Sequence, residues 1–320
     1  MLTGQGELVR EWGSKLLPAG LIVNADDLGI HPRINAGIRS AFEHGILTSC
    51  TMLVTTPFLH ETVREFVKPR ILPIGLHLAL TQGKATAPLS EVPDLVDDSG
   101  DLVLSAARLL SSNLSQKSKL LVQVRREFEC QLSLALDCGL RPTHVDSHQH
   151  VHMNPAFFSL LQNLLPRFGI NRIRFCNEPL WSFSLYERPY TLMKRSNYAK
   201  WTVLKYRSKQ IRPSVEVNDI LFGILYSGCV SKSSVIRAIC TASNNLCFEI
   251  CIHPGFPADQ SDKVYPRANY NAFISSKDRQ REHDILLDEE VRAAVAANGW
   301  VLRSYNGRTK VPDLSARVSS

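Results

Sequence analysis

Short apolar segments alternate with amphipathic segments along almost the whole chain, and this alternation limits the possible folds more than any other feature. Segments with the helical spacing of apolar residues, such as 117–137, lie between most of the strand-like runs. The strand-like runs are GLIVNA (20–25), LTSCTMLV, PIGLHLA, PTHVDSH, NRIRFC, LFGIL, LCFEICI and WVLRSY. The pattern predicts an α/β fold, and about seven strands favour a closed, distorted (β/α) barrel over an open sheet.

The same pattern predicts the domain boundaries. Residues 20–306 form a single barrel domain, which follows an N-terminal extension at 1–19 and precedes a flexible tail at 307–320. Two segments interrupt the alternation, a polar one at about 82–116 and a basic one at about 177–215. We interpret both as insertions, and the polar one as a candidate active-site loop.

Composition excludes several classes of protein. Hydrophobic residues make up 44% and charged residues 21% of the 320 residues, which indicates a folded globular chain. No apolar run reaches the roughly 18 residues that a membrane-spanning helix needs. Glu7 and Glu11 interrupt the region where a signal peptide would be apolar. The eight cysteines are scattered without a CxxC pair, so we predict reduced thiols in a cytoplasmic protein.

The net charge of +7 is concentrated in one region. Residues 167–212 hold eleven Lys and Arg residues against Glu178 and Glu187, and the rest of the chain is close to neutral. No zinc-finger, RNP or KH signature accompanies these charges, so no nucleic-acid partner is predicted. Aromatic residues lie between the charges at 181–212. They favour either a peripheral contact with an anionic membrane or a helical segment whose rings pack on the barrel.

Polar residues that could carry chemistry follow the predicted strands. The C-terminal ends of the strands of a parallel barrel open into one cleft. Six titratable residues fall at four of these ends: Asp26, Asp27, His77, Asp146, His148 and His253. The window 144–152 alone holds four of the ten histidines, and we expect one of them to be a metal ligand. The alternatives are a helix cap at Asp26 and Asp27 and an ordinary core histidine at His77.

The chemistry of this set suits the hydrolysis of an amide. Two imidazoles and one carboxylate with open coordination positions form a hydrolytic metal site, in which the ion acidifies a water molecule and polarises a carbonyl. A neighbouring carboxylate can act as the general base, and His253 can supply a proton to a departing amine. The sequence has no Gly-rich phosphate loop, G-x-S-x-G elbow or H-E-x-x-H helix, which argues against nucleotide-binding, serine-hydrolase and zincin chemistry.

The segments NADDLG, GLHLAL, THVDSHQHVH and EICIHPGF resemble, in order and spacing, the motifs of the YdjC-like carbohydrate deacetylases. That family includes chito-oligosaccharide deacetylases and a hopanoid-associated relative, and the resemblance extends over residues 21–305. It implies a TIM-like barrel related to the polysaccharide deacetylases, which removes N-acetyl groups from acetamido sugars with one divalent metal ion. Carried onto this chain, it implies that the metal ligands are Asp27, His77 and His148, the base is Asp26 and the acid is His253.

Several properties stay open at this point. The resemblance implies magnesium, whereas two imidazole ligands favour zinc, cobalt or manganese. The predicted substrate is an acetamido sugar, either free or attached to an oligosaccharide or a lipid. The alternatives are a metal-dependent esterase or phosphoesterase with the same ligands, and a sugar-binding barrel without turnover. The oligomeric state is not predicted, and a homodimer is one alternative.

Overall fold

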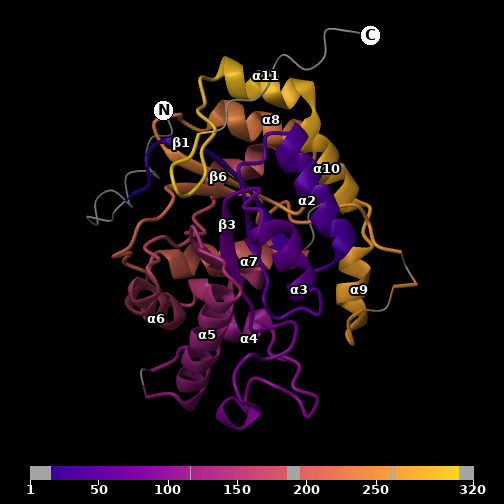
Figure 1. The fold of residues 1–320 in the computed structure, drawn as a ribbon. Helices are drawn as coiled ribbons and strands as arrows, with labels where there is room; N and C mark the ends of the chain where they lie inside the picture. The colour runs from indigo at the N-terminus through magenta and orange to yellow at the C-terminus, as the bar shows by residue number, and fades with distance from the viewer. Residues whose placement is uncertain (1–15, 116, 186–194, 260, 263, 310–320) are drawn as a thin grey trace.

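The computed structural model describes residues 16–115, 117–185, 195–259, 261–262 and 264–309 (Figure 1). Its centre is one sheet of six parallel strands: β1 (Gly20–Leu28), β2 (Ser49–Met52), β3 (Ile74–Leu78), β4 (Val145–Ser147), β5 (Ile220–Phe222) and β6 (Cys247–Ile252). Their order across the sheet is β4-β3-β2-β1-β6-β5. The predicted α/β class and distorted barrel are confirmed, although the sheet has six strands and not about seven.

Two of the predicted strands, NRIRFC and WVLRSY, form isolated bridges instead of ladders. In the first, Ile173 bridges Val145 of β4, and the neighbouring Arg172 bridges Glu216, which lies shortly before β5. The backbone N–H of Ile173 donates to the carbonyl of Glu216 at 3.0 Å. This segment therefore connects the two edge strands and curls the sheet. The second segment meets the start of β1 through a single bridge.

Ten α-helices within the described ranges connect the strands: α2 (Pro32–His44), α3 (Leu59–Thr62), α4 (Ala106–Ser111), α5 (Lys119–Asp137), α6 (Pro155–Leu164), α7 (Arg195–Ser208), α8 (Lys232–Thr241), α9 (Ala268–Ile274), α10 (Asp278–Leu287) and α11 (Glu289–Ala297). Helix α2 packs beside α10, α8 beside α11 and α5 beside α6 (Figure 1). Helices α10 and α11 are separate because Asp288 ends α10 and caps α11. None of these helices has the length and apolar character to cross a membrane.

Both predicted insertions contain ordered structure. The polar stretch includes α4, and its start is attached to α5 by the buried carboxylate of Glu127, which accepts hydrogen bonds from the backbone of Thr86 and Ala87. The basic stretch includes α7 and a 3-10 segment at Leu180–Leu185. The division into extension, domain and tail stays a prediction.

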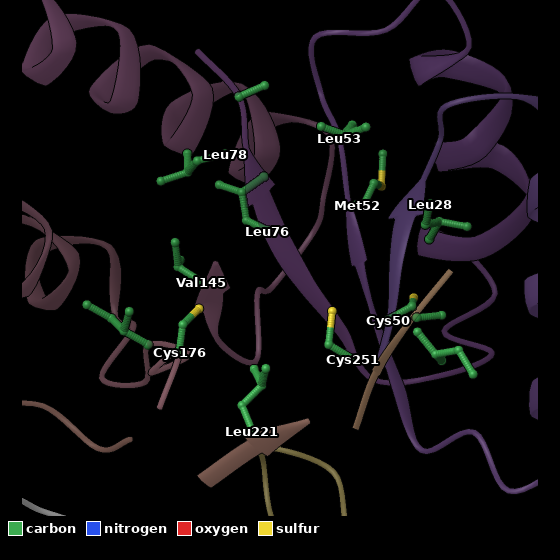
Figure 2. Close-up of a cluster of buried hydrophobic side chains, with 14 of the residues drawn as sticks. Leu28, Cys50, Met52, Leu53, Leu76, Leu78, Val145, Cys176, Leu221 and Cys251 are labelled. Carbon is green, nitrogen blue, oxygen red and sulfur yellow. The ribbon is translucent and has the colours of Figure 1, made fainter. Parts of the chain in front are cut away.

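Every strand is buried along its whole length, as expected for a sheet covered on both faces. Figure 2 shows that each of the six strands contributes to the apolar core, through Leu28, Cys50, Met52, Leu76, Leu78, Val145, Leu221 and Cys251. No disulfide joins the eight cysteines, as predicted, and the cytoplasmic location stays a prediction. Polar side chains in these strands are buried too, and burial is costly unless each has a partner.

Candidate active site

The six titratable residues predicted at strand ends come together at one end of the sheet. His77 of β3 lies directly opposite Asp146 of β4 in the parallel register. Strand β4 ends at Ser147 and β6 at Ile252, so that His148 and His253 follow immediately. The helix-cap alternative for Asp26 and Asp27 is wrong, because His31 caps α2.

Asp27, His77 and His148 form a candidate metal centre. Asp27 Oδ1 lies 3.1 Å from His148 Nδ1 and 3.6 Å from His77 Nε2. One potential ligand atom from each of the three side chains lies within 4.8 Å of the other two. Asp27 has a φ of 70°, a left-handed conformation that is strained for a residue other than glycine. Such strain is concentrated at functional sites, where the surrounding structure holds it in place.

The second nitrogen of His77 is fixed by Asp146. Asp146 Oδ1 lies 2.6 Å from His77 Nδ1, an arrangement that orients a metal-binding imidazole and leaves Nε2 for the ion. Burial opposes the charged form of His77, but Asp146, Asp26 and Asp27 outweigh it and raise the pKa of His77 to about 9. Burial lowers the pKa of His148, which favours the neutral imidazole that a metal ligand must be.

Asp26 is held by a fully buried guanidinium. Arg174 donates to both carboxylate oxygens of Asp26 at 2.7 Å, and it also contacts Asp146 at 2.5 Å and Glu249 at 2.8 Å. Burial raises the pKa of Asp26, but Arg174 and His77 more than offset it, and the pKa lies well below its usual range. Asp26 is therefore ionised at neutral pH. Because Arg174 already neutralises it, the two other candidate metal groups, which both include Asp26, suit a cation less well than the Asp27 group.

The residues around the Asp27 group fit a divalent cation. Four buried carboxylates surround two buried guanidiniums, so the cluster carries two excess negative charges when all four carboxylates are ionised and His77 has lost its proton. The carboxylates are Asp26, Asp27, Asp146 and Glu249, and the guanidiniums are Arg174 and Arg279. His148 Nε2 is buried and has no hydrogen-bond partner among the described residues. A nitrogen, nitrogen and oxygen donor set is typical of a catalytic metal site.

A cavity of about 200 Å³ opens onto this cluster. Its lining consists of Asp26, His77, His148, Gln149, His150, Lys200, Ser227, His253, Tyr270 and Phe273. None of these residues comes from the polar stretch at 82–116, so the described part of that stretch does not form the active-site loop that we predicted. A larger and shallower depression between α8 and α10, about 640 Å³ in volume, contains none of the titratable residues predicted at strand ends.

His253 is placed by the loop that follows β6. Its backbone N–H donates to the carboxylate of Glu282 at 2.6 Å. One of its ring nitrogens lies within 4.8 Å of a carboxylate oxygen of Asp26. The loop packs on α2 without any space, since a Cβ added to Gly37 would lie 2.5 Å from the Cα atom of Gly255. Close backbone contact therefore fixes the position from which His253 reaches the cavity.

One of the four histidines in the window 144–152 belongs to the Asp27 group. His144 stacks on Tyr305 at 3.6 Å between ring centroids, and burial lowers its pKa to about 3. His152 contacts the Ser147 hydroxyl at 2.6 Å. His150 lines the cavity. His148 is the member that joins the Asp27 group, so the other three have structural or cavity-facing positions.

Four charged residues of the site were not predicted from the sequence. Arg174 and Glu249 are charged residues inside strand-like apolar runs, RIRF and CFEIC, and this contrast was a usable signal. Arg279 of α10 contacts Asp27 Oδ2 at 3.0 Å, and Lys200 of α7 lines the cavity. Both belong to polar helical segments, where a basic residue carries no special signal.

The aromatic residues of the basic segment are mainly packed within the described ranges. Trp201 is buried and contacts Phe183 edge to face at 4.7 Å between centroids, and Trp181 contacts Phe248. Tyr198 is exposed. These contacts favour packing on the barrel for part of the segment, and contact with an anionic membrane stays a prediction. Residues 186–194 of the predicted segment, among them Tyr186, Tyr190 and Leu192, lie outside the described residues.

The fold and the site define a parallel α/β barrel protein with a candidate divalent-metal centre at the carboxyl ends of its strands. The family model for YdjC-like proteins matches residues 20–297, and the chain belongs to this family. The resemblance inferred from its motifs is therefore confirmed.

Two curated relatives are similar over most of their length. A carbohydrate deacetylase from Geobacillus stearothermophilus is 34% identical over 289 residues, which cover 90% of this chain and 98% of the relative. A chitooligosaccharide deacetylase from Serratia marcescens is 35% identical over 286 residues, which cover 89% and 97%. A crystal structure from Enterococcus faecalis, described as a cellobiose-phosphate cleavage protein, superimposes with a TM-score of 0.65 at 25% identity, covering 90% of this chain and 98% of that one.

Proposed function

We propose that this protein is a metal-dependent hydrolase that removes the N-acetyl group from an acetamido sugar. The proposal depends on one observation, which is that Asp26, His77, His148 and His253 all line the same cavity. The names of the Geobacillus and Serratia relatives, both deacetylases of carbohydrates, support the same reaction.

Two residues of the protein carry out the two proton transfers, with Asp26 as the acceptor and His253 as the donor. Asp26, ionised at neutral pH, accepts a proton as a water oxygen bonds to the carbonyl carbon of the acetamide. His253 then donates a proton to the nitrogen as the carbon–nitrogen bond breaks. The products are acetate and the free amino sugar. Arg174 keeps the Asp26 carboxylate in one orientation throughout, since it contacts both oxygens.

Asp27, His77 and His148 would hold the ion. When bound, a divalent metal there supplies a Lewis acid that polarises the carbonyl and lowers the pKa of water. The two imidazoles favour zinc, cobalt or manganese, whereas the family resemblance implies magnesium. Metal content after purification and reloading with each ion separates these alternatives.

The lining of the cavity supports a sugar as the substrate. Tyr270 and Phe273 offer aromatic rings to the apolar face of a pyranose, and polar side chains occupy the rest of the lining. An esterase or phosphoesterase could use the same metal ligands, and a sugar-binding protein could use the same lining. A pure binding protein would have no need for Asp26 beside the metal ligands.

The test is hydrolysis by protein loaded separately with magnesium, zinc, cobalt and manganese. We expect stoichiometric release of acetate and free amine from N-acetylglucosamine or N,N′-diacetylchitobiose with at least one ion. Slower turnover of an acetyl ester and of an aryl phosphate by the same preparation is also expected. Preferred cleavage of either ester would assign the site to the esterase or phosphoesterase alternative. Sugar binding without cleavage under every ion would make it a binding protein.

A further inference from the structure

The turn after His148 has an unusual backbone. Gln149 and His150 are consecutive, and both have left-handed conformations, with φ values of 57° and 61°. A single non-glycine residue in this region is uncommon, and two in succession persist only where neighbouring contacts determine them. The turn leaves His150 buried and facing the cavity, with its Nδ1 atom lacking a hydrogen-bond partner among the described residues.

Two polar side chains from α7 and from the segment after β5 line the cavity together with His150. They are Lys200 of α7 and Ser227, which follows β5. Helix α7 is attached to this region because Asn197, one turn before Lys200, donates to the backbone carbonyls of Leu225 and Ser227 at 3.2 and 2.9 Å. The position of Lys200 at the cavity is therefore built into the fold through a buried amide.

None of these three residues takes part in the proposed hydrolysis. They belong to neither the Asp27 group nor the proton-transfer pair. A strained backbone and a buried nitrogen without a partner are unfavourable in the protein alone, and a ligand that hydrogen-bonds to them would offset the cost. An imidazole, an ammonium and a hydroxyl are all groups that hydrogen-bond to neutral hydroxyl oxygens.

We infer that His150, Lys200 and Ser227 form a hydroxyl-recognition wall, which binds the hydroxyl groups of the acetamido sugar. The inference rests on the proposed function and goes beyond it, because it assigns sugar selectivity to residues that do not touch the scissile amide. Tyr270 and Phe273 pack on the apolar face of the ring, and the wall hydrogen-bonds to its polar edge. An acetamide without ring hydroxyls reaches the same catalytic residues but leaves His150 Nδ1 without a hydrogen-bond partner.

The experiment compares N-acetylglucosamine with N-cyclohexylacetamide, which has the same scissile amide and ring size but no hydroxyl groups. In the metal-loaded enzyme, His150→Ala and Lys200→Met should each lower kcat/KM for N-acetylglucosamine by about tenfold or more, as expected for a lost buried hydrogen bond. The values for N-cyclohexylacetamide should change less than about twofold. Lys209→Met, which removes an exposed charge just beyond α7, is the control and should change neither value.

A binding measurement covers the case in which the cyclohexyl compound is cleaved too slowly to quantify. Calorimetry with Asp26→Asn protein should show weaker binding of N-acetylglucosamine after His150→Ala is added, with unchanged metal affinity. Equal losses for both acetamides, or no loss for the sugar, would overturn the hydroxyl-recognition wall. Failure of the unsubstituted enzyme to cleave any acetamide would instead refute the proposed function, and the sugar-binding result would still decide the role of His150.

Discussion

Replacement of Asp146 by Asn tests whether this carboxylate, which is not a proposed ligand, strengthens metal binding through its contact with His77. Asp146 contacts His77 Nδ1 at 2.6 Å and Arg174 at 2.5 Å, and both contacts depend on its negative charge. Loss of such a partner typically weakens metal binding by about 10 to 100-fold, or about 1.4 to 2.7 kcal/mol. We expect close to this full loss at pH 9, where about half of His77 in the unsubstituted protein has lost its proton and competition from the proton lowers the apparent affinity only about twofold.

The difference between the two proteins should shrink at lower pH. The pKa of His77 is about 9, above its ordinary value of about 6.5, so the protonated ring stabilises the metal-free fold below about pH 6.5. That contribution is lost as the pH rises through about 9. An ion must displace this proton, and the apparent affinity of the unsubstituted protein should fall about tenfold per pH unit below 9. Asp146→Asn removes the main cause of the raised pKa, so its affinity should change little down to about pH 7.

The assay is calorimetric titration of metal-free protein with zinc or manganese between pH 6.5 and 9, in buffers with different ionisation enthalpies. Unsubstituted protein should release close to one proton per ion at pH 7.5, and the Asn variant much less. Asp101→Asn removes a carboxylate that pairs with Lys84 on the surface and should leave the curve unchanged. A constant affinity ratio between the Asp146→Asn and unsubstituted proteins across this pH range would refute the reasoning about His77.

Three further predictions concern the ligands, the base and the basic segment. His77→Ala should lose metal and activity together, and full metal occupancy in that variant would contradict the ligand assignment. Asp26→Asn should keep the ion while the rate falls by about 100-fold or more, as for the loss of a general base; a loss of metal equal to that in Asp27→Ala would mean that the two roles are wrongly divided. The protein should co-sediment with anionic liposomes at low salt and dissociate at high salt, through a segment that exposes Tyr198 and Tyr206. Absence of binding at low salt would leave packing on the barrel as the role of that segment.

The composition of the candidate active-site cluster could be predicted because it depends on topology alone. Parallel strands bring their carboxyl ends to one edge, so the polar residues that follow β1, β3, β4 and β6 had to meet there. His77 lies inside an apolar run, and only its combination with the other strand ends predicted that it joins this cluster. The number of strands was overestimated, since NRIRFC has the composition of a strand but pairs through single bridges.

The partners of the carboxylates could not be predicted in the same way. Arg174 contacts Asp26 across 148 residues, and Arg279 contacts Asp27 across 252. These pairs depend on side-chain conformation and on how α10 packs against α2, neither of which follows from local patterns. The left-handed conformations of Gln149 and His150 oppose local preference, so a propensity argument would place them elsewhere.

The contact between Gly37 and Gly255 limits how this enzyme could be altered by directed evolution. Position 37 lies on a surface helix far from β6 in the sequence, and a mutational library would ordinarily treat it as neutral. Any side chain there would push against the loop that carries His253, because a Cβ atom would also lie 2.8 Å from the backbone nitrogen of Phe256. Variation at position 37 is therefore coupled to the geometry of the proposed acid, and a change of substrate preference is better sought in α7.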